Sequence, residues 1–151
     1  MEHWEPSEPP FTVRRPAEIR DAALAHDLAR AASWILGGSL GAWGQWWLAQ
    51  ADLVVFLWLP PALRLTRLQA REQARYGAAI RRDPARAEQA RAFLTWAAGY
   101  DDNSCGGSRT LANHTAWLQE FTCPVLELRG DLTVAERLAS VQAKLREQRL
   151  V

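Results

Sequence analysis

The longest uninterrupted hydrophobic run in the chain is LVVFLWL at residues 53–59, between Asp52 and the pair Pro60-Pro61. Residues 53–59 are too few for a buried helix, and their branched and aromatic side chains favour a strand. An apolar run without polar alternation is typical of a strand that is covered on both faces, as in a parallel sheet. We therefore predict a central buried strand at residues 53–59.

An arginine-rich helix is predicted directly after this strand. Pro60 would end the strand, and Pro61 suits the first turn of a helix because its missing N–H would be unpaired there. At about 100° per residue, four of the arginines that follow fall within an arc of roughly 80°. Open α/β sheets usually bind ligands at the carboxyl ends of their strands, so this arginine stripe either faces an anion or forms a solvated helix surface. The stripe consists of Arg64, Arg67, Arg71 and Arg75.

Four further helices are predicted from apolar periodicity and capping residues. They cover residues 16–32, a segment that starts at Asp83 or Pro84, residues 109–121, and a closing segment from the cap Thr133 to about Gln148. The polar and glycine-rich residues 101–108, DDNSCGGS, are predicted to form a loop.

Two more strands are predicted from short apolar runs, SWIL at residues 33–36 and CPVLEL at residues 123–128. The alternation of helices and strands predicts an α/β sandwich with a parallel sheet. A chain of 151 residues is long enough for one domain with its own core, so a single domain at residues 1–151 is expected. Its proline-rich residues 1–15 predict an extended lead-in.

Charge narrows the classes of partner. The formal net charge of +1 argues against a general nucleic-acid binder, which needs a surplus of cations to displace phosphate counterions. The positive charge is nevertheless concentrated, because residues 64–91 carry eight arginines against three acidic residues, Glu72, Asp83 and Glu88. We therefore expect this arginine-rich region to meet an anionic ligand or partner that is not nucleic acid.

The hydrophobic runs, the first ten residues and the cysteines together predict where in the cell the protein is found. No apolar run is long enough to cross a bilayer, and the acidic, proline-rich residues 1–10 do not resemble a signal peptide. Cys105 and Cys123 have neither metal-ligand nor redox spacing. A cytoplasmic protein without a membrane partner is therefore expected.

The glycine-rich residues 37–44, GGSLGAWG, were compared with the phosphate loop GxxxxGK[ST]. They do not match, because that loop needs a lysine to reach the β and γ phosphates and an adjacent hydroxyl for magnesium. The only lysine is Lys144, in the predicted closing helix, and no other segment fits the motif. No spacing of histidine, cysteine or acidic residues predicts a metal site.

Two other groups of residues leave alternatives open. The sequence YDD at residues 100–102 is either a paired-carboxylate site or part of a solvated loop. The tryptophans at positions 43, 46 and 47 either pack in the core or form a platform on which a base stacks.

Six segments, in order along nearly the whole chain, together resemble a bacterial family of adenylate-kinase-like P-loop ATPases. They are PSEPPFTVRRP, SWILGGSLGAWG, DLVVFLWLPPALRLTRLQAREQARYG, FLTWAAGYDD, SRTLANHTAWL and CPVLELRGDLTVAERL. The resemblance implies a three-layer αβα, P-loop kinase-like fold with sheet order 2-3-1-4-5. In that fold SWIL would be strand 3, LVVFLWL strand 4 and PVLEL strand 5.

The resemblance also implies roles for individual residues, with ATP and magnesium as cofactors. The lid arginines, which close over the transferred phosphoryl group, would be Arg71 and Arg75. The turn beside the adenine would contain Gly130, Asp131 and Thr133. The residues on the substrate side would be Trp4, Arg14, Arg15, Arg64 and Arg67.

One part of the family pattern has no counterpart in this sequence. Such proteins begin with a strand, the phosphate loop, a helix and a second strand, so we expect codons upstream of Met1 to encode that unit. Phosphoryl transfer from ATP to a nucleotide or a small metabolite is expected of the family, and no catalysis is expected of these 151 residues alone. The alternative function is a non-catalytic module that binds an anionic partner through its arginine stripe. Self-association through exposed sheet edges is expected in either case.

Overall fold

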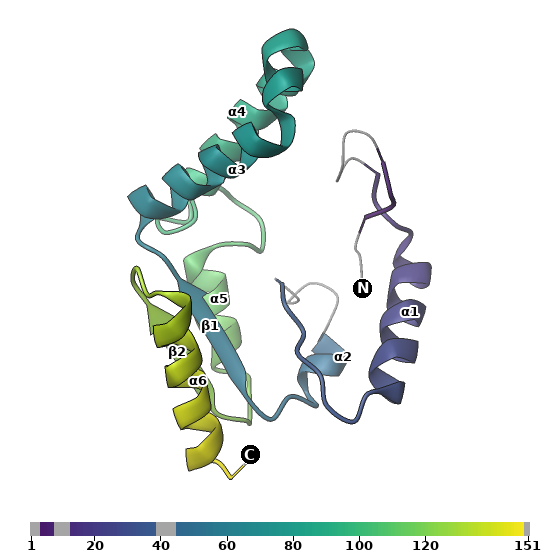
Figure 1. The fold of residues 1–151 in the computed structure, drawn as a ribbon, viewed down its shortest axis with the longest axis vertical. Coiled ribbons are helices and arrows are strands. Elements are labelled where there is room, and N and C mark those ends of the chain that lie inside the picture. The colour runs from purple at the N-terminus through teal and green to yellow at the C-terminus, as the bar shows by residue number, and fades with distance from the viewer. Residues whose placement is uncertain (1–3, 8–12, 39–44, 150–151) are drawn as a thin grey trace. The chain divides into compact units, whose positions relative to one another are not determined.

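A computed structural model describes residues 4–7, 13–38 and 45–149 of the chain (Figure 1). The chain divides into two compact units, Met1–Gly38 and Ser39–Val151, and each is described by itself. The organisation as a single domain stays a prediction.

The smaller unit contains one helix, α1 (Ala17–Arg30), within the predicted residues 16–32. Leu24 is buried on this helix, together with the aliphatic stem of Arg20. In the lead-in, the extended residues Trp4 and Arg14 form an antiparallel bridge. The predicted strand at residues 33–36 is wrong: this segment is irregular, and Ile35 is fully exposed. A short apolar run forms a strand only beside a partner strand, and none of the described residues pairs with it.

The larger unit is a mixed α/β structure with a parallel sheet, which confirms the predicted class at this level. Its elements are α2 (Gln45–Leu48), β1 (Val54–Trp58), α3 (Pro61–Arg82), α4 (Pro84–Ala98), α5 (Leu111–Leu118), β2 (Val125–Arg129) and α6 (Val134–Glu147). Among the described residues the sheet has two strands, and β1 pairs with β2 in register from Val54 opposite Val125 to Trp58 opposite Arg129.

Capping residues explain where several helices begin. Pro61 is the first residue of α3, as predicted, and the Asp83 carboxylate accepts a hydrogen bond from the N–H of Ala85 at the start of α4. Thr133 and Glu136 form a complete capping box for α6. The Thr110 hydroxyl caps α5, so this helix starts later than the predicted residue 109. It also ends earlier, at Leu118, than the predicted residue 121.

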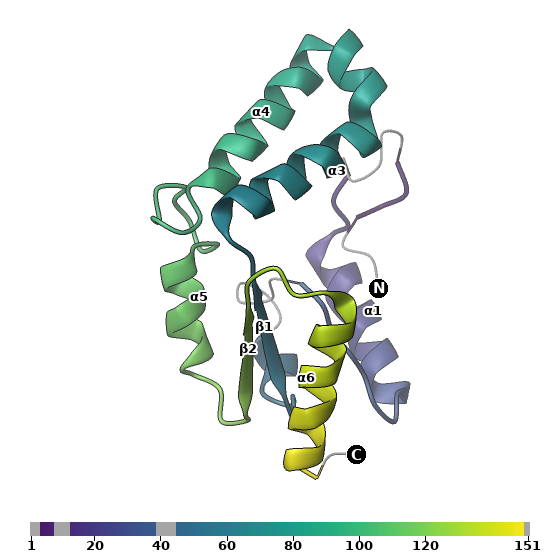
Figure 2. The ribbon, with the colours of Figure 1, turned by 60° about the vertical axis from the view of Figure 1, so that its left-hand side comes forward.

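The two faces of the sheet are covered unequally. On one face the ring of Phe56 in β1 lies 6.3 Å from the ring of His114 in α5. On the other face α6 contacts β2 (Figure 2 shows the two helices on opposite sides of the sheet). Leu57 and Leu128 are register partners and share a face, yet Leu128 is 7% exposed and Leu57 is 57% exposed. The prediction that β1 is covered on both faces is therefore wrong, because α6 packs on its neighbour β2.

Each of the two strands has one edge without a strand partner among the described residues. Self-association through these edges stays a prediction. In the same part of the chain, no helix combines the length and the apolar character needed to span a membrane.

Helices α3 and α4 form a hairpin that leaves the carboxyl end of β1 and returns towards the sheet (Figures 1 and 2). Tyr76 of α3 and Ala90 of α4 are buried in it. The guanidinium carbon of Arg86 lies 3.6 Å from the centre of the Tyr76 ring, a cation–π contact that joins the two helices. The hairpin delivers the end of α4 back to the end of β1.

Candidate functional site

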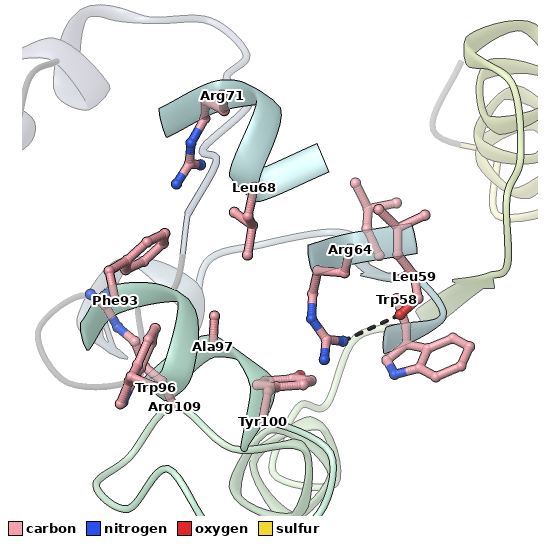
Figure 3. A pocket seen from close by; sticks show the side chains of 11 residues that line it. Trp58, Leu59, Arg64, Leu68, Arg71, Phe93, Trp96, Ala97, Tyr100 and Arg109 are labelled. Carbon is pink, nitrogen blue, oxygen red and sulfur yellow. Dashed lines mark hydrogen bonds between the residues drawn. The ribbon is translucent and has the colours of Figure 1, made fainter. Parts of the chain in front are cut away.

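A cavity of about 330 Å³ lies at the carboxyl end of β1, between α3 and α4 (Figure 3). Its position is the one at which open α/β sheets usually bind ligands. Its lining combines three arginines with four aromatic rings and contains no acidic residue. The lining residues are Leu57, Trp58, Leu59, Arg64, Leu68, Arg71, Phe93, Trp96, Ala97, Tyr100 and Arg109.

The helical repeat explains how two helices line one cavity. Arg64, Leu68 and Arg71 follow one another at spacings of four and three, so they share the face of α3 that looks towards α4. Phe93, Trp96 and Ala97 share the facing side of α4 by the same spacing. Two of the four stripe arginines, Arg64 and Arg71, thus line the cavity, and their role in binding an anion stays a prediction. The aromatic residues of the lining were not predicted.

Arg64 is held at the inner end of the cavity by Asp101. The two side chains form an ion pair and are only 17% and 22% exposed. Asp101 also accepts a hydrogen bond of 2.8 Å from the indole N–H of Trp58, and the Arg64 guanidinium stacks 4.8 Å from the centre of the Tyr100 ring. Burial acts to raise the pKa of Asp101, but the hydrogen bonds from Arg64 and Trp58 outweigh it and hold that pKa below its usual value. Asp101 is therefore a structural anion, whereas Asp102 is exposed and accepts a hydrogen bond from the N–H of Ser104.

Tyr100 continues this network into α5. Its hydroxyl lies 2.8 Å from Nδ1 of His114. Burial raises the pKa of Tyr100, and burial together with the charge of Arg109 lowers the pKa of His114. Both shifts favour the neutral forms, so a phenol and a neutral imidazole share this hydrogen bond at neutral pH.

Arg71 and Arg109 form the cationic outer part of the cavity. Arg71 is 43% exposed, lies 3.5 Å from Glu72, and has its guanidinium carbon 5.6 Å from the centre of the Phe93 ring. The Phe93 ring in turn stacks on Trp96 at 6.1 Å. Arg109 is exposed, and its guanidinium group has no hydrogen bond or ion pair with any residue that the structure describes. No periodic pattern in the sequence indicates a role for Arg109, because it lies in a loop outside the predicted stripe.

A second group of predicted residues meets at the carboxyl edge of the sheet. Arg67 lies on the other flank of the stripe and forms an ion pair of 2.6 Å with Asp131, in the turn between β2 and α6. In the same turn, the N–H of Gly130 donates a hydrogen bond of 3.0 Å to the carbonyl of Trp58 at the end of β1. The hydroxyl and N–H of Thr133 are both bonded to Glu136. One residue predicted for the adenine side, Asp131, is thus in contact with one predicted for the substrate side, Arg67.

Four further residues were predicted for the site, one on α3 and three in the smaller unit. Arg75 is exposed, one turn beyond Arg71 on α3. Trp4, Arg14 and Arg15 belong to the smaller unit, where the Arg14 guanidinium lies 5.6 Å from the centre of the Trp4 ring and Arg15 pairs with Glu5 at 3.2 Å. Their substrate role stays a prediction.

The groups present do not by themselves fit magnesium and ATP. Lys144 is paired with Glu147 at 3.0 Å on α6, at a distance in sequence from any glycine turn. Within residues 4–7, 13–38 and 45–149, no three histidine, cysteine or acidic side chains are grouped so that they could hold a metal ion. Gly41, Gly44 and Trp43 lie outside the described residues, as does the side chain of Trp46, so the base-stacking platform stays a prediction.

Comparison with known proteins gives one clear relationship. The uncharacterized protein YqaC of Bacillus subtilis (strain 168) is 40% identical to this chain over 131 residues, which make up 87% of the chain and 73% of the Bacillus protein. The chain belongs to the YqaC family. No model of a protein family and no solved structure matches it.

Proposed function

We propose that this chain is the arginine-bearing part of a nucleotide-kinase-like protein, which transfers a phosphoryl group from ATP to a nucleotide or a small metabolite. The observation that carries the proposal is the contact between Arg67 and Asp131, 2.6 Å apart at the carboxyl edge of the parallel sheet. It places the arginine helix α3 beside the turn after β2, where the family resemblance expects the adenine.

Phosphoryl transfer depends mainly on positioning and on neutralising the charge of the phosphates. Guanidinium groups suit this task, since they stay charged and bind phosphate oxygens in pairs. Arg71 and Arg75 continue the α3 stripe beyond Arg67 and are exposed, and the proposal assigns them the role of lid arginines. The chain's own contribution would be to hold and screen anionic oxygens.

The finer fold belongs to the same proposal. A three-layer P-loop kinase-like sandwich requires parallel strands with helices on both faces. The parallel pair β1 and β2, with α5 against Phe56 and α6 against β2, is consistent with strands 4 and 5 of that fold. The sheet order 2-3-1-4-5 is part of the proposal.

The alternative, an interaction module that uses the whole arginine stripe, has less support. Three of its four arginines have acidic partners within the chain, namely Asp101 for Arg64, Asp131 for Arg67 and Glu72 for Arg71. An external anion would have to compete with these carboxylates.

The proposal is tested on the YqaC protein itself. Purified YqaC is expected to convert ATP to ADP in the presence of magnesium and the right acceptor, at a rate of order 1–100 per second typical of kinases. A panel of nucleoside monophosphates and of hydroxylated or phosphorylated metabolites would be screened with radiolabelled ATP, with acceptor-free and magnesium-free reactions as controls. Acceptor-independent rates throughout the panel would contradict phosphoryl transfer.

The present chain is expected not to bind Mg-ATP tightly. Without a backbone N–H cradle and its lysine, three phosphates would meet only flexible guanidinium groups. Isothermal titration calorimetry should show no saturable binding up to about 1 mM ATP, which corresponds to a binding free energy weaker than about 4 kcal/mol. A micromolar Kd would show that the described residues suffice for ATP.

A further inference from the structure

The cavity between α3 and α4 has an excess of unbalanced positive charge. All three of its arginines line the cavity without an acidic residue among the lining, and Arg64 is paired with the carboxylate of Asp101 beside it. Arg71 has Glu72 at 3.5 Å, and the guanidinium of Arg109 has no partner among the described residues. In addition, the Nε of Arg64 is buried and lacks a hydrogen-bond partner within the described structure. Unmatched donors beside a cavity are costly unless an anion or another acceptor satisfies them.

The rest of the lining is suited to a flat apolar group. Phe93 and Trp96 are stacked, with an angle of 29° between their rings, and Leu57 and Leu68 complete the apolar surface (Figure 3). Aromatic side chains of this kind hold planar rings by offset or edge contacts. The volume of about 330 Å³ is at the lower end of the range for small-molecule pockets, which favours one ring over a complete nucleotide.

We propose that this cavity is a binding site for a small aromatic anion, a single ring that carries one phosphate or carboxylate group. Arg71 and Arg109 bind the oxyanion, and Trp96 with Phe93 contacts the ring. The ion pair of Arg64 with Asp101 fixes the inner wall. This site is separate from the Arg67–Asp131 edge, and the proposal does not depend on phosphoryl transfer.

The first experiment compares the parts of such a ligand by isothermal titration calorimetry of the full chain. The probes are phenyl phosphate, benzoate, inorganic phosphate, phenol and AMP. Either phenyl phosphate or benzoate is expected to bind with a Kd below about 1 mM, at least tenfold more tightly than inorganic phosphate or phenol. The reason is that phenyl phosphate and benzoate contact both the arginines and the aromatic side chains, whereas inorganic phosphate and phenol each contact one of these groups. The probe of these two that binds more tightly shows whether the site prefers a phosphate or a carboxylate group.

The second experiment locates the site. Arg71→Gln, Arg109→Gln and Trp96→Ala are each expected to raise the Kd of the better probe about tenfold. The matched control is Arg91→Gln, since Arg91 is an exposed arginine of α4 that pairs with Glu88 and does not line the cavity. Thermal melts would establish that each variant is folded, and benzoate-induced shifts of the Trp96 indole NMR signal provide a second readout in the unaltered chain.

Three results would overturn the proposal. Inorganic phosphate that binds as tightly as phenyl phosphate would remove the ring from the recognition. AMP that binds tenfold more tightly than phenyl phosphate would show that the site is built for a nucleotide. Equal losses in Arg91→Gln and Arg109→Gln would place the binding elsewhere. Any of these, together with phosphoryl transfer by YqaC, would reject the aromatic-anion site and leave the proposed function standing.

Discussion

A Gly99→Ala variant is expected to lose about 2–3 kcal/mol of unfolding free energy, the upper range for overpacking a close contact. Gly99 ends α4 and is buried. A β-carbon there would lie 2.4 Å from the backbone nitrogen of Cys105 and 2.5 Å from the hydroxyl oxygen of Ser104. The loop after α4 would have to move, because the N–H of Cys105 also donates a hydrogen bond to the carbonyl of Gly99.

The matched control is Gly77→Ala, in the middle of α3. A β-carbon at Gly77 would crowd the amide end of the Gln73 side chain, which can rotate away, and would lie 3.6 Å from a guanidinium nitrogen of Arg81, an ordinary contact distance. Alanine is also the better helix former, so this variant is expected to gain about 0.5–1 kcal/mol. Urea denaturation followed by circular dichroism would measure both variants. Equal stabilities of Gly99→Ala and the unaltered chain would show that the loop does not pack against Gly99 as described.

This loop matters for the cavity because Tyr100 and Asp101 directly follow Gly99. A displaced loop would move Asp101 away from Arg64 and the Tyr100 hydroxyl away from His114. We therefore expect Gly99→Ala to weaken binding of the aromatic anion as well, although it changes no residue that lines the cavity.

Local signals in the sequence predicted the local structure well. Pro61 and the recurring arginines predicted α3, and Thr133 predicted the start of α6, since caps act within one turn. Apolar runs were less informative. The run at residues 53–59 contains β1, and the run at residues 123–128 covers β2 except for its last residue, Arg129. In contrast, SWIL at residues 33–36 does not form a strand. Composition cannot reveal whether a neighbouring strand is present to pair with a run.

The full set of residues that line the cavity could not be predicted either, because some of them meet only in the tertiary structure. Arg64 and Arg71 were expected near a ligand, because they follow a strand end and share a helix face. Phe93, Trp96 and Arg109 reach the same cavity only because the α3–α4 hairpin folds back on itself. Their distances from Arg64 along the chain follow no helical or strand period, so only the tertiary structure relates them.

Replacing Asp101 by asparagine is expected to cost about 2 kcal/mol of unfolding free energy. Asparagine keeps the acceptor for Trp58 but removes the charge that balances Arg64. Breaking a fully buried ion pair costs about 3–5 kcal/mol, and these side chains are 17% and 22% exposed, so a smaller loss is expected. Asp52→Asn, at an exposed carboxylate before β1, is the control and should change stability by less than about 0.5 kcal/mol.

The pH dependence of the Asp101→Asn variant gives a second readout of the same ion pair. The pKa of Asp101 is depressed in the folded chain, so its contribution is complete above the ordinary carboxyl value and is lost as the pH falls through the folded-state pKa. The difference in melting temperature between the unaltered chain and Asp101→Asn should therefore be constant from about pH 5 to 7 and shrink below about pH 4. Calorimetric melts across this range would measure it. A difference that persists unchanged at low pH would mean that the variant acts through packing, and that the charge of Asp101 does not hold Arg64 in place.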